Sequence, residues 1–530
     1  MSFKKAFARK LKGNNYLIHL WDDGGYQKIE WLNQAYSECG EGDASHIGLN
    51  GEPLRKVRNW DRDDPNLHFH DMPPYQKFLV EKYGVDDEPS ITHKEIFFDI
   101  EIEMGGALTE EYIKSAPKKV TSIAWYDKQV DLWGILILDA KNQLKHTKAK
   151  NKEIIPCRTE DELLMKFIEK FREMDPDIIV GWNSDYFDIP YLYYRICNVL
   201  GEDIARYLSP IGYVRETPWS LDYMRLHKKF SWADEPSFKL DAIGEKYAGL
   251  NKIEYDGNLD KLFEDDPLKF IQYNFRDVEI LKVLDEKLEY LSLVKNLAHK
   301  GKHNYSEVYA NTKTQDGAIS AYLLSKGIVP PAKERNPLSK KNYAGGYLFC
   351  PKAGIYNYMF DEDLTSLYPS IIMTINIGKE TMVGRIIDAD DRNNRLGLND
   401  LQNKNPEEEL IVENTKRRRT KVPIEKLIKM IEDNELSVSA NGVLFRTDKE
   451  SVLSTILKKW FDERVMYKNK MKKAFKEGDK EGGAGFHMKQ YTMKILLNSL
   501  YGATALGSFR YGNVILSEAI TLSGQRIIQE

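Results

Sequence analysis

The sequence lacks several features that mark other classes of protein. Its four cysteines, Cys39, Cys157, Cys197 and Cys350, are scattered without CxxC spacing, which argues against a zinc site or a disulfide framework and suits a reducing compartment. No apolar run approaches the roughly 18 residues of a membrane span. The first residues include no hydrophobic signal core, and there is no internal repeat. We therefore expect no membrane-embedded part.

The sequence also lacks an excess of positive charge. A formal net charge of −4 argues mildly against a protein that only coats nucleic acid, although an acidic chain can still hold a local basic groove. The composition, 42% hydrophobic and 30% charged, is that of globular domains and excludes disordered, collagenous and coiled-coil chains. A chain of 530 residues is expected to form several domains.

One segment, residues 363–370 with the sequence DLTSLYPS, combines a carboxylate with the start of a helix. The apolar run Tyr356–Phe360 predicts a strand that delivers Asp363 into a cleft, and Pro369 fixes the backbone where the helix begins. Such a strand, turn and helix can hold a metal ion beside a phosphate. Taken alone, the pattern is better explained as a strand end with a solvated Asp363.

A second segment supplies groups that such a site needs. Lys494, Asn498 and Tyr501 recur at i, i+4 and i+7, so they lie on one face of a helix. Arg464 and Lys468 form an i, i+4 pair on an earlier helix. Cations that face a metal-binding carboxylate are what a triphosphate clamp requires. Each of these residues alone is better explained as a surface side chain, so the hypothesis depends on the set.

The segments 363–370 and 494–502 resemble two polymerase motifs of family B DNA polymerases, written roughly DxxSLYPS and KxxxNSxYG. The likeness is greatest to the replicative polymerases of T-even-type bacteriophages. The resemblance implies that Asp363 and the backbone carbonyl of Leu364 bind a metal ion, and that the ring of Tyr368 lies beneath the sugar, where it excludes a ribose 2′-hydroxyl. The nucleotide-binding residues that it implies are Ser366, Leu367, Tyr368, Arg464, Lys468, Lys494, Asn498 and Tyr501.

A further pair of acids lies in the apolar run 96–102. Asp99 and Glu101 are two residues apart, so a strand places both carboxylates on one face. Two neighbouring carboxylates in apolar surroundings repel each other and lose solvation, so they need a cation. A solvent-facing edge strand is less compatible with the nearly continuous apolar run.

Three more residues join this pair. The buried strand expected over 177–183 is followed by Asp188 near the start of a helix, a usual place for a catalytic acid in an α/β sheet. A helix that begins at Pro267 carries Tyr273 and Asp277 on one face at i, i+4. A capping box at Thr159–Glu162 predicts the start of another helix between these elements.

Together these five residues resemble the signature of the DEDDy-type proofreading exonucleases. The resemblance implies two Mg²⁺ (or Mn²⁺) ions per active site, since oxygen ligands of this kind suit those ions. It implies that Asp99, Glu101 and Asp277 hold one ion, that Asp99 bridges to the other, that Asp188 binds that ion partly through water, and that Tyr273 orients the nucleophile.

The expected fold is a multidomain α/β and α+β protein with a small N-terminal domain, an RNase H-like 3′–5′ exonuclease domain, and a partial polymerase palm with helical-hairpin fingers. The helices of the hairpin are expected over 451–476 and 487–503, on either side of a glycine-rich tip. The domains expected are 1–93, an accessory domain with a return segment 291–334; 94–290, the exonuclease; 335–450, the first part of the palm; 451–506, the fingers; and 507–530, a truncated second part of the palm.

Two loop segments are less informative. Tyr343, Gly345 and Gly346 resemble an aromatic-x-Gly-Gly motif that touches template DNA in the family, but a plain turn explains the glycines equally well. Residues 388–409 are polar and acidic, which predicts a surface insertion. The basic run 416–421 is most often a solvated loop, and we assign it no role from sequence.

The sequence departs from the family in one respect. The family's second catalytic palm aspartate lies in a later Asp-Thr-Asp hairpin, but no aspartate follows Asp479 here, and the helix expected over 516–529 reaches the end of the sequence. We therefore expect that a second polymerase chain, or a missing C-terminal part, supplies that aspartate and the thumb. The apolar positions of that helix predict a partner surface.

The resemblance further implies primer–template DNA and dNTPs as partners, with a sliding clamp as a possible addition, and a phage-encoded protein in the cytoplasm of a bacterial host. Two alternatives remain open. One is a stand-alone 3′–5′ exonuclease whose fingers only hold DNA. The other is a nucleic-acid-binding translational regulator that acts through residues 1–93.

Overall fold

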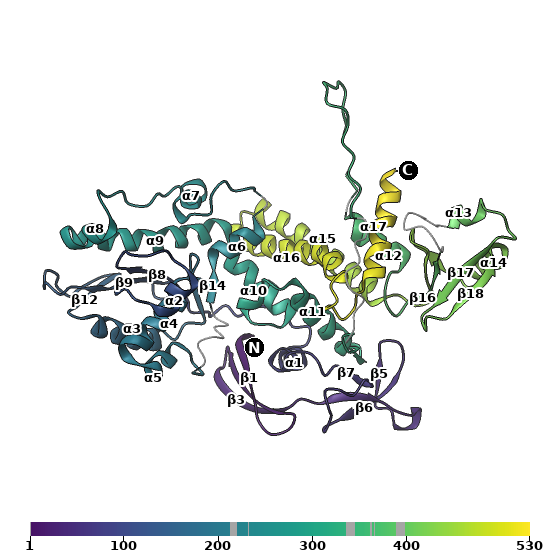
Figure 1. The fold of residues 1–530 in the computed structure, drawn as a ribbon, viewed down its shortest axis with the longest axis horizontal. Helices are drawn as coiled ribbons and strands as arrows, with labels where there is room; N and C mark the ends of the chain where they lie inside the picture. Colours follow the sequence, from purple (N-terminus) through teal and green to yellow (C-terminus); the bar gives the residue numbers. More distant parts are fainter. Residues whose placement is uncertain are drawn as a thin grey trace.

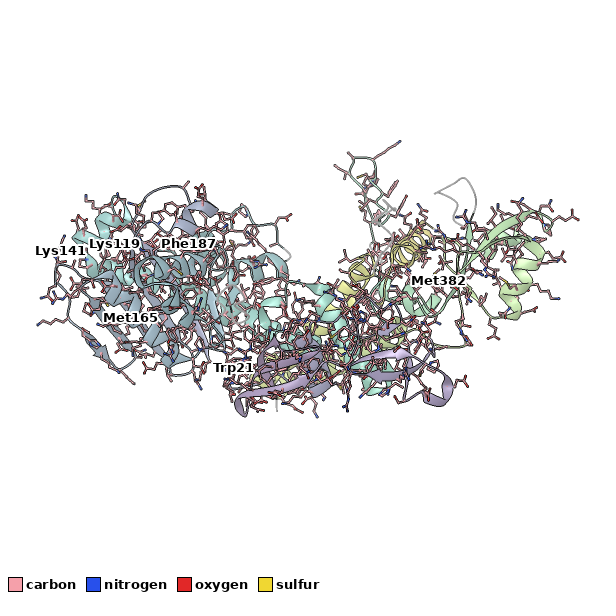
Figure 2. All side chains as sticks on the ribbon, turned by 60° about the horizontal axis from the view of Figure 1, so that its bottom comes forward. Trp21, Lys119, Lys141, Met165, Phe187 and Met382 are labelled. Atoms are coloured by element: carbon pink, nitrogen blue, oxygen red, sulfur yellow. The ribbon has the colours of Figure 1, made fainter. Side chains whose placement is uncertain are left out.

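The computed structural model describes residues 2–212, 220–231, 233–334, 345–360, 363–364, 366–387 and 398–529. The molecule is elongated (Figure 1). A seven-stranded sheet lies at one end, the five-stranded sheet formed by residues 382–445 lies at the other, and long helices lie between them. In Figure 2, Phe187 and Met382 mark these two ends. Within the described ranges, no helix is long and apolar enough to cross a membrane.

The N-terminal region forms two small sheets. The first is a three-stranded antiparallel sheet of β1 (Phe3–Lys10), β2 (Asn15–Asp22) and β3 (Gly25–Leu32), in which β2 and β3 form a hairpin. The second sheet has the order β15-β5-β6-β4-β7. Its strands are β4 (Ala35–Glu38), β5 (His46–Gly48), β6 (Pro53–Val57), β7 (Leu67–His68) and β15 (Ile328–Val329), and helix α1 (Pro74–Tyr83) follows them. Because β15 pairs with β5, the chain returns to this region after the seven-stranded sheet.

The seven-stranded sheet has the order β11-β12-β10-β9-β8-β13-β14. Its strands are β8 (Glu95–Ile102), β9 (Val120–Asp127), β10 (Leu132–Leu138), β11 (Thr147–Ala149), β12 (Lys152–Cys157), β13 (Ile178–Gly181) and β14 (Ser220–Asp222). The helices around it are α2 (Glu110–Ser115), α3 (Glu160–Met174), α4 (Asp188–Leu200), α5 (Glu202–Ala205), α6 (Tyr223–Phe230), α7 (Leu240–Ile243), α8 (Leu259–Asp265) and α9 (Pro267–Leu288). Strand β8 pairs antiparallel with β9 and parallel with β13, so the sheet is mixed.

The side chains of β8 alternate between the two faces of the sheet and pack against different helices on each face. Ile96, Phe98 and Ile100 are buried in one apolar cluster with residues of α3 and α4. Phe97 is buried in another cluster with residues of α9, on the opposite face. Since successive side chains of a strand point to opposite faces, Asp99 and Glu101 lie on the α9 face. Burying each of these large apolar side chains contributes about 1.5–3 kcal/mol, so the register of β8 is strongly specified.

The expected starts of two helices are confirmed, each with a side-chain cap. The Thr159 hydroxyl accepts a hydrogen bond from the Glu162 N–H, 3.4 Å away, at the start of α3. The Asp266 carboxylate accepts from the Lys269 N–H, 3.0 Å away, and Pro267 occupies the first position of α9. Such caps satisfy backbone donors that the first turn leaves free.

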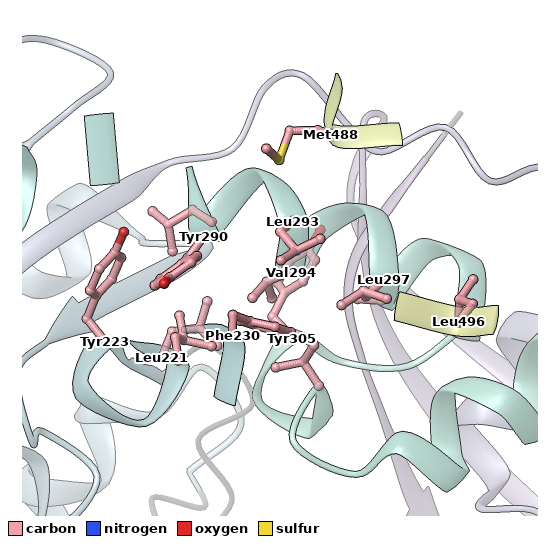
Figure 3. Packing of buried hydrophobic residues seen from close by; sticks show 14 of the residues in the cluster. Leu221, Tyr223, Phe230, Tyr290, Leu293, Val294, Leu297, Tyr305, Met488 and Leu496 are labelled. Atoms are coloured by element: carbon pink, nitrogen blue, oxygen red, sulfur yellow. The ribbon is translucent and has the colours of Figure 1, made fainter. Parts of the chain in front are cut away.

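The centre of the molecule is built on α10 (Tyr290–Gly301) and α11 (Asn311–Ser325). Figure 3 shows Leu293, Val294 and Leu297 on α10, with Leu221 and Tyr305 below them and Met488 and Leu496 to their other side. All belong to one buried apolar cluster that also contains residues of α9. The cluster is therefore continuous from the seven-stranded sheet to the helical hairpin described next.

The helical hairpin consists of α15 (Val452–Lys476) and α16 (Lys480–Thr504). The prediction that the second helix begins near residue 487 is wrong, because the glycine-rich segment is itself helical. Asp479 caps this helix by accepting from the Gly482 N–H at 2.8 Å. Gly483 allows the two helices to touch, since a Cβ there would lie 2.5 Å from the Phe475 ring. This close packing offsets the cost of glycine in a helix, about 1 kcal/mol per residue.

The remaining elements are α12 (Leu367–Ile375), α17 (Val514–Gln529) and a small subdomain. The subdomain is an antiparallel sheet of order β18-β17-β16-β20-β19. Its parts are β16 (Met382–Ile387), α13 (Leu398–Gln402), β17 (Glu409–Asn414), β18 (Arg419–Pro423), α14 (Ile424–Asp433), β19 (Ser437–Val438) and β20 (Val443–Phe445).

The strand predicted over Tyr356–Phe360 is not present. Residues 345–360 form no strand and project from the molecule as an extended excursion (Figure 1). Large apolar side chains here are exposed, among them Leu348 at 95%, Ile355 at 96% and Tyr358 at 100%. A strand needs a neighbour to take up its hydrogen bonds, and none of the strands in the described ranges pairs with this segment.

Candidate functional site

Three carboxylates from two elements meet on the α9 face of the seven-stranded sheet. Asp99 and Glu101 project from β8, and Asp277 projects from α9, which crosses that strand. Each of the three offers an oxygen that lies within 4.8 Å of the others. In the part of the chain that the structure describes, this is the only such group of acidic, histidine or cysteine side chains. The strand spacing and the helix packing together create the cluster.

Asp188, at the first position of α4, is 4% exposed and borders the cluster. Its carboxylate accepts hydrogen bonds from its own backbone and from that of Ile100, the residue between Asp99 and Glu101. The structure thus brings four sequence-predicted acids to the same part of β8. Asp188 is not among the three whose oxygens lie within 4.8 Å of one another.

Burial raises the pKa of Asp99, Glu101, Asp277 and Asp188, and repulsion among these acids adds to it for Asp99 and Glu101. Burial raises the pKa of Glu101 to about 8, with repulsion from Asp277 as the next cause. Burial raises the pKa of Asp188 to about 7. The pKa of Asp99 is well above its ordinary value because of burial and the charges of Asp277 and Glu101. The charged forms are therefore costly unless a cation is close.

A residue that sequence reasoning missed, Lys252, supplies one such cation. Its ammonium donates hydrogen bonds to the Asp277 carboxylate and to the Tyr273 hydroxyl, the latter at 3.2 Å. Burial is the largest single effect and acts to lower the pKa of Lys252, but the charges of Asp277, Tyr273 and Asp99 and the hydrogen bond to Asp277 together outweigh it, and the pKa is raised. Lys252 lies 25 residues before Asp277, outside any regular element, so no spacing in the sequence indicated it.

Asn274 is a second missed residue. Its amide donates to Asp99 at 2.6 Å, and its own carbonyl oxygen accepts from the Ser122 hydroxyl at 2.8 Å. Asn274 is fully buried and follows Tyr273 directly. A buried amide beside an i, i+4 pair of site residues was the available signal. The bond holds one oxygen of Asp99 in place.

The cluster fits a divalent cation with oxygen ligands. Asp277 Oδ1 is buried and has no hydrogen-bond partner among the described residues, while Oδ2 receives Lys252. An unpaired buried carboxylate oxygen needs a partner, because leaving it unsatisfied costs about 1–3 kcal/mol or more. Carboxylate oxygens at this spacing are the ligands that Mg²⁺ or Mn²⁺ prefers.

The second predicted site, around Asp363, is less complete. Asp363 and Leu364 are exposed, and Asp363 is in no cluster of three possible metal ligands within the described ranges. Tyr368 on α12 and Tyr501 on α16 are in contact, with ring centroids 4.4 Å apart. The structure thus brings together two of the residues predicted to bind nucleotide. Ser366 precedes α12, with a left-handed φ of 53°, and Leu367 begins it.

Helix α17 holds a glycine segment beside Tyr368. Gln525, a buried residue, donates to the Gly345 carbonyl at 2.6 Å. A Cβ at Gly346 would lie 3.2 Å from the Tyr368 hydroxyl, and one at Gly524 would lie 3.1 Å from the Tyr368 ring. Sequence reasoning missed Gln525 and Gly524. Tyr343 lies outside the described residues.

The predicted cations lie along the helical hairpin. Arg464 and Lys468 are on α15, and Lys494 and Asn498 are on α16. Lys468 and Asn498 are exposed, whereas Arg464 is partly buried with its Nε unpartnered among the described residues.

The fold is that of a multidomain α/β protein, and its first cluster is a group of carboxylates that could hold a metal ion. Residues 310–530 match the model of DNA polymerase family B, and residues 78–217 match that of the family B exonuclease domain. The two models describe different regions of such polymerases, and this chain is similar to both of them. Such polymerases generally use divalent metal ions.

Individual DNA polymerases are also similar to this chain. The chain is 28% identical to a DNA-directed DNA polymerase of Escherichia phage RB69, over 95% of this chain and 63% of that protein. It is 25% identical to that of Enterobacteria phage T4, over 98% and 65%. The chain thus spans less than two thirds of these relatives' length. A solved family B DNA polymerase from the archaeon Pyrobaculum calidifontis has the same fold, with a TM-score of 0.67 and 17% identity over 100% of this chain and 71% of that one.

Proposed function

We propose that this chain is the exonuclease-bearing part of a family B DNA-directed DNA polymerase. It removes nucleotides from DNA 3′ ends with two Mg²⁺ (or Mn²⁺) ions, and it synthesises DNA only with a second chain or a further C-terminal part. The observation that carries the proposal is the cluster of Asp99, Glu101 and Asp277, whose oxygens lie within 4.8 Å of one another. The strand order β10-β9-β8-β13-β14 at its centre supports an RNase H-like exonuclease domain.

Each residue of the cluster has a task in 3′–5′ hydrolysis. Asp99, Glu101 and Asp277 would hold one divalent ion, and Asp188 with Asp99 would hold the other. Such ions, when bound, would supply activation of the attacking water and stabilisation of the leaving 3′ oxygen. Tyr273, which is fixed by the Lys252 ammonium, orients the attacking water. Lys252 and Asn274 keep Asp277 and Asp99 in position.

In the polymerase region, this chain supplies only part of the active site. Asp363 and the Leu364 carbonyl bind one ion, and Ser366, Leu367 and Tyr368 contact the nucleotide. Arg464, Lys468 and Lys494 reach the triphosphate when the helical hairpin closes. Asn498 and Tyr501 line the nascent base pair, and Tyr343, Gly345 and Gly346 contact the template. A lone Asp363 leaves the site without a second metal-binding aspartate, so synthesis alone is nearly absent.

Two observations support the need for further polypeptide. No aspartate follows Asp479. The apolar segment 347–360, which leads directly to Asp363, is exposed, as expected of a surface that another element covers. The partners are primer–template DNA, dNTPs, the completing polypeptide and a sliding clamp. The similarity to phage polymerases supports a phage protein that acts in the cytoplasm of a bacterial host.

The test uses the purified chain, Mg²⁺ and a DNA duplex with a frayed, labelled 3′ end. We expect digestion from that end, and loss of digestion in the Asp99→Ala/Glu101→Ala variant. Equal behaviour of the two proteins would refute the exonuclease. Primer extension is then measured with the chain alone and with a polypeptide that covers the remainder of the phage relatives.

A stand-alone 3′–5′ exonuclease is a second candidate, because only one metal-binding cluster is found in the described ranges. Extension that appears on adding the completing polypeptide favours the polymerase. Digestion without any extension favours the stand-alone enzyme.

A further inference from the structure

The turn of the β17–β18 hairpin concentrates positive charge at the end of the molecule opposite the exonuclease cluster (Figure 1). Residues 416–421 have the sequence KRRRTK, and all six are exposed. The cations are Lys416, Arg417, Arg418, Arg419 and Lys421. Over 409–423 the only acids are Glu409 and Glu413.

The turn has a defined shape. The Asn414 side chain accepts hydrogen bonds from the N–H groups of Lys416 and Arg418, each at 3.0 Å. Arg417 adopts the left-handed region with φ 60°. Its N–H bonds to the Asn414 carbonyl at 2.9 Å. A preformed turn lowers the entropy lost when its side chains bind a ligand.

The two faces of the sheet differ. Leu410, Val412 and Val422 pack with α13 and α14 on one face. By strand alternation, Arg419 and Lys421 lie on the other face, which neither helix covers. The register also places Glu409 and Glu413 on the open face, so that face carries both signs, whereas the tip, Lys416 to Arg418, is purely basic.

The open face adjoins the polymerase region. Arg385 of β16 lies opposite Glu413 in the register and forms an ion pair of 3.7 Å with Glu518 of α17. The same helix contacts Tyr368 through Gly524. The open face therefore lies on the side of the subdomain that meets α17.

Most of these cations have no acidic partner. Arg419 pairs with Glu413 at 2.9 Å, but over the described ranges Lys416, Arg417, Arg418 and Lys421 make no ion pair within 4 Å. An ordinary solvated face mixes the two signs. Helix α14 does so, since its exposed residues include Glu425, Lys426, Lys429 and Glu432.

We propose that the β17–β18 tip, Lys416 to Arg418, with Lys421 beside it, binds the phosphate backbone of the DNA that the polymerase region holds. The proposal rests on the proposed function. Guanidinium groups match phosphate oxygens in a two-point geometry, and such contacts carry no sequence preference. A contact with the DNA backbone outside the active site would raise the affinity for DNA without changing the reaction catalysed there.

The experiment measures binding of the full chain to a fluorescent primer–template by anisotropy over a salt titration, with Ca²⁺ replacing Mg²⁺ to prevent digestion. Arg417→Gln/Arg418→Gln removes two tip cations. Lys426→Gln/Lys429→Gln removes two cations from α14 in the same subdomain and is the matched control. Both variants must unfold at the wild-type temperature, as expected for exposed positions.

We expect the Arg417/Arg418 variant to bind about 10- to 50-fold more weakly near 0.1 M salt, with the slope of log Kd against log salt reduced by about 1.8, or about 0.9 per phosphate contact. The Lys426/Lys429 control variant should have the same Kd and the same salt slope as wild type. If the Arg417/Arg418 variant loses affinity for duplex DNA but not for single-stranded DNA, the tip contacts the duplex. If it loses affinity only for single-stranded DNA, the tip contacts the single strand. An unchanged slope in the Arg417/Arg418 variant overturns this proposal alone, whereas a wild-type chain without DNA affinity overturns the proposed function.

Discussion

The Lys252 ammonium is hydrogen-bonded to the Asp277 carboxylate, across 25 residues of sequence. The bond occupies Oδ2 of Asp277 and leaves its buried Oδ1 without a partner in the described part of the chain. Lys252 thus neutralises part of the acidic cluster and leaves the remaining oxygen available to bind a cation. The geometry makes Lys252 a positioning residue for the acidic cluster.

Replacing Lys252 should weaken the exonuclease. Lys252→Met removes the charge and both hydrogen bonds, so we expect digestion of a frayed 3′ end to fall about 10- to 100-fold, as for other partners of metal ligands. The rate is measured over a Mg²⁺ titration, which separates weaker metal binding from slower hydrolysis. Lys246→Met removes an exposed lysine that pairs with Glu235 and serves as the control. Equal rates in the three proteins would contradict the role given to Lys252.

The metal-free chain should lose stability as the pH rises. Burial raises the pKa of Glu101 to about 8 and that of Asp188 to about 7 in the folded chain, from ordinary values near 4.5 and 3.8. Between these limits the unfolded chain has released protons that the folded chain keeps, so the free energy of unfolding falls as pH rises through this window. Mg²⁺ should therefore raise Tm more at pH 8 than at pH 6.

The control for this prediction is Asp99→Asn/Glu101→Gln, which keeps the shape of the side chains without their charge. It should show a flatter decline of Tm between pH 5 and 8 and little response to Mg²⁺. If wild type and variant give parallel Tm curves, the cluster does not carry the pH dependence.

Arg510 should be essential for stability. Its fully buried guanidinium bonds to Asp316 at 2.8 Å and to Asp71 at 2.6 Å, so it joins α11, the N-terminal region and the segment after α16. Arg510→Met leaves the Asp71 carboxylate without an ion-pair partner among the described residues and leaves Asp316 with only Lys333, 3.3 Å away. We expect a loss of about 3–5 kcal/mol in the free energy of unfolding. Denaturant unfolding measures it.

Arg446→Met is the comparison for Arg510. Arg446 pairs with Asp448 at the surface, so its loss should not change the unfolding midpoint. Similar midpoints for the Arg510 and Arg446 variants would show that the buried network contributes little.

Gln525 should control how firmly residues 345–346 are held. Gln525→Ala removes the hydrogen bond to the Gly345 carbonyl, worth about 1 kcal/mol. We expect amide hydrogen exchange in a peptide that covers residues 345–350 to quicken about 5-fold, with Gln490→Ala of α16 as the control. Unchanged exchange would mean that other contacts hold the segment.

Period-two spacing was enough to place Asp99 and Glu101 on one face, because the pleat of a strand allows no other arrangement. Helix starts at Thr159 and Pro267 were equally local, since a cap and a proline act within one turn. The helical start of α16 was not foreseen, because Gly483 is tolerated there only through its contact with Phe475 on another helix. The strand expected over Tyr356–Phe360 failed for the opposite reason: its apolar pattern meets no neighbouring strand in the described ranges.

The sequence by itself determined which residue types occur and which of them share a strand face or a helix face, since those relations depend on the backbone repeat alone. Only the tertiary structure decided that Asp277 approaches Asp99, that Lys252 pairs with Asp277, and that Gln525 reaches Gly345. These contacts join positions far apart in the chain, and they depend on which apolar faces pack together, a choice that no local spacing records.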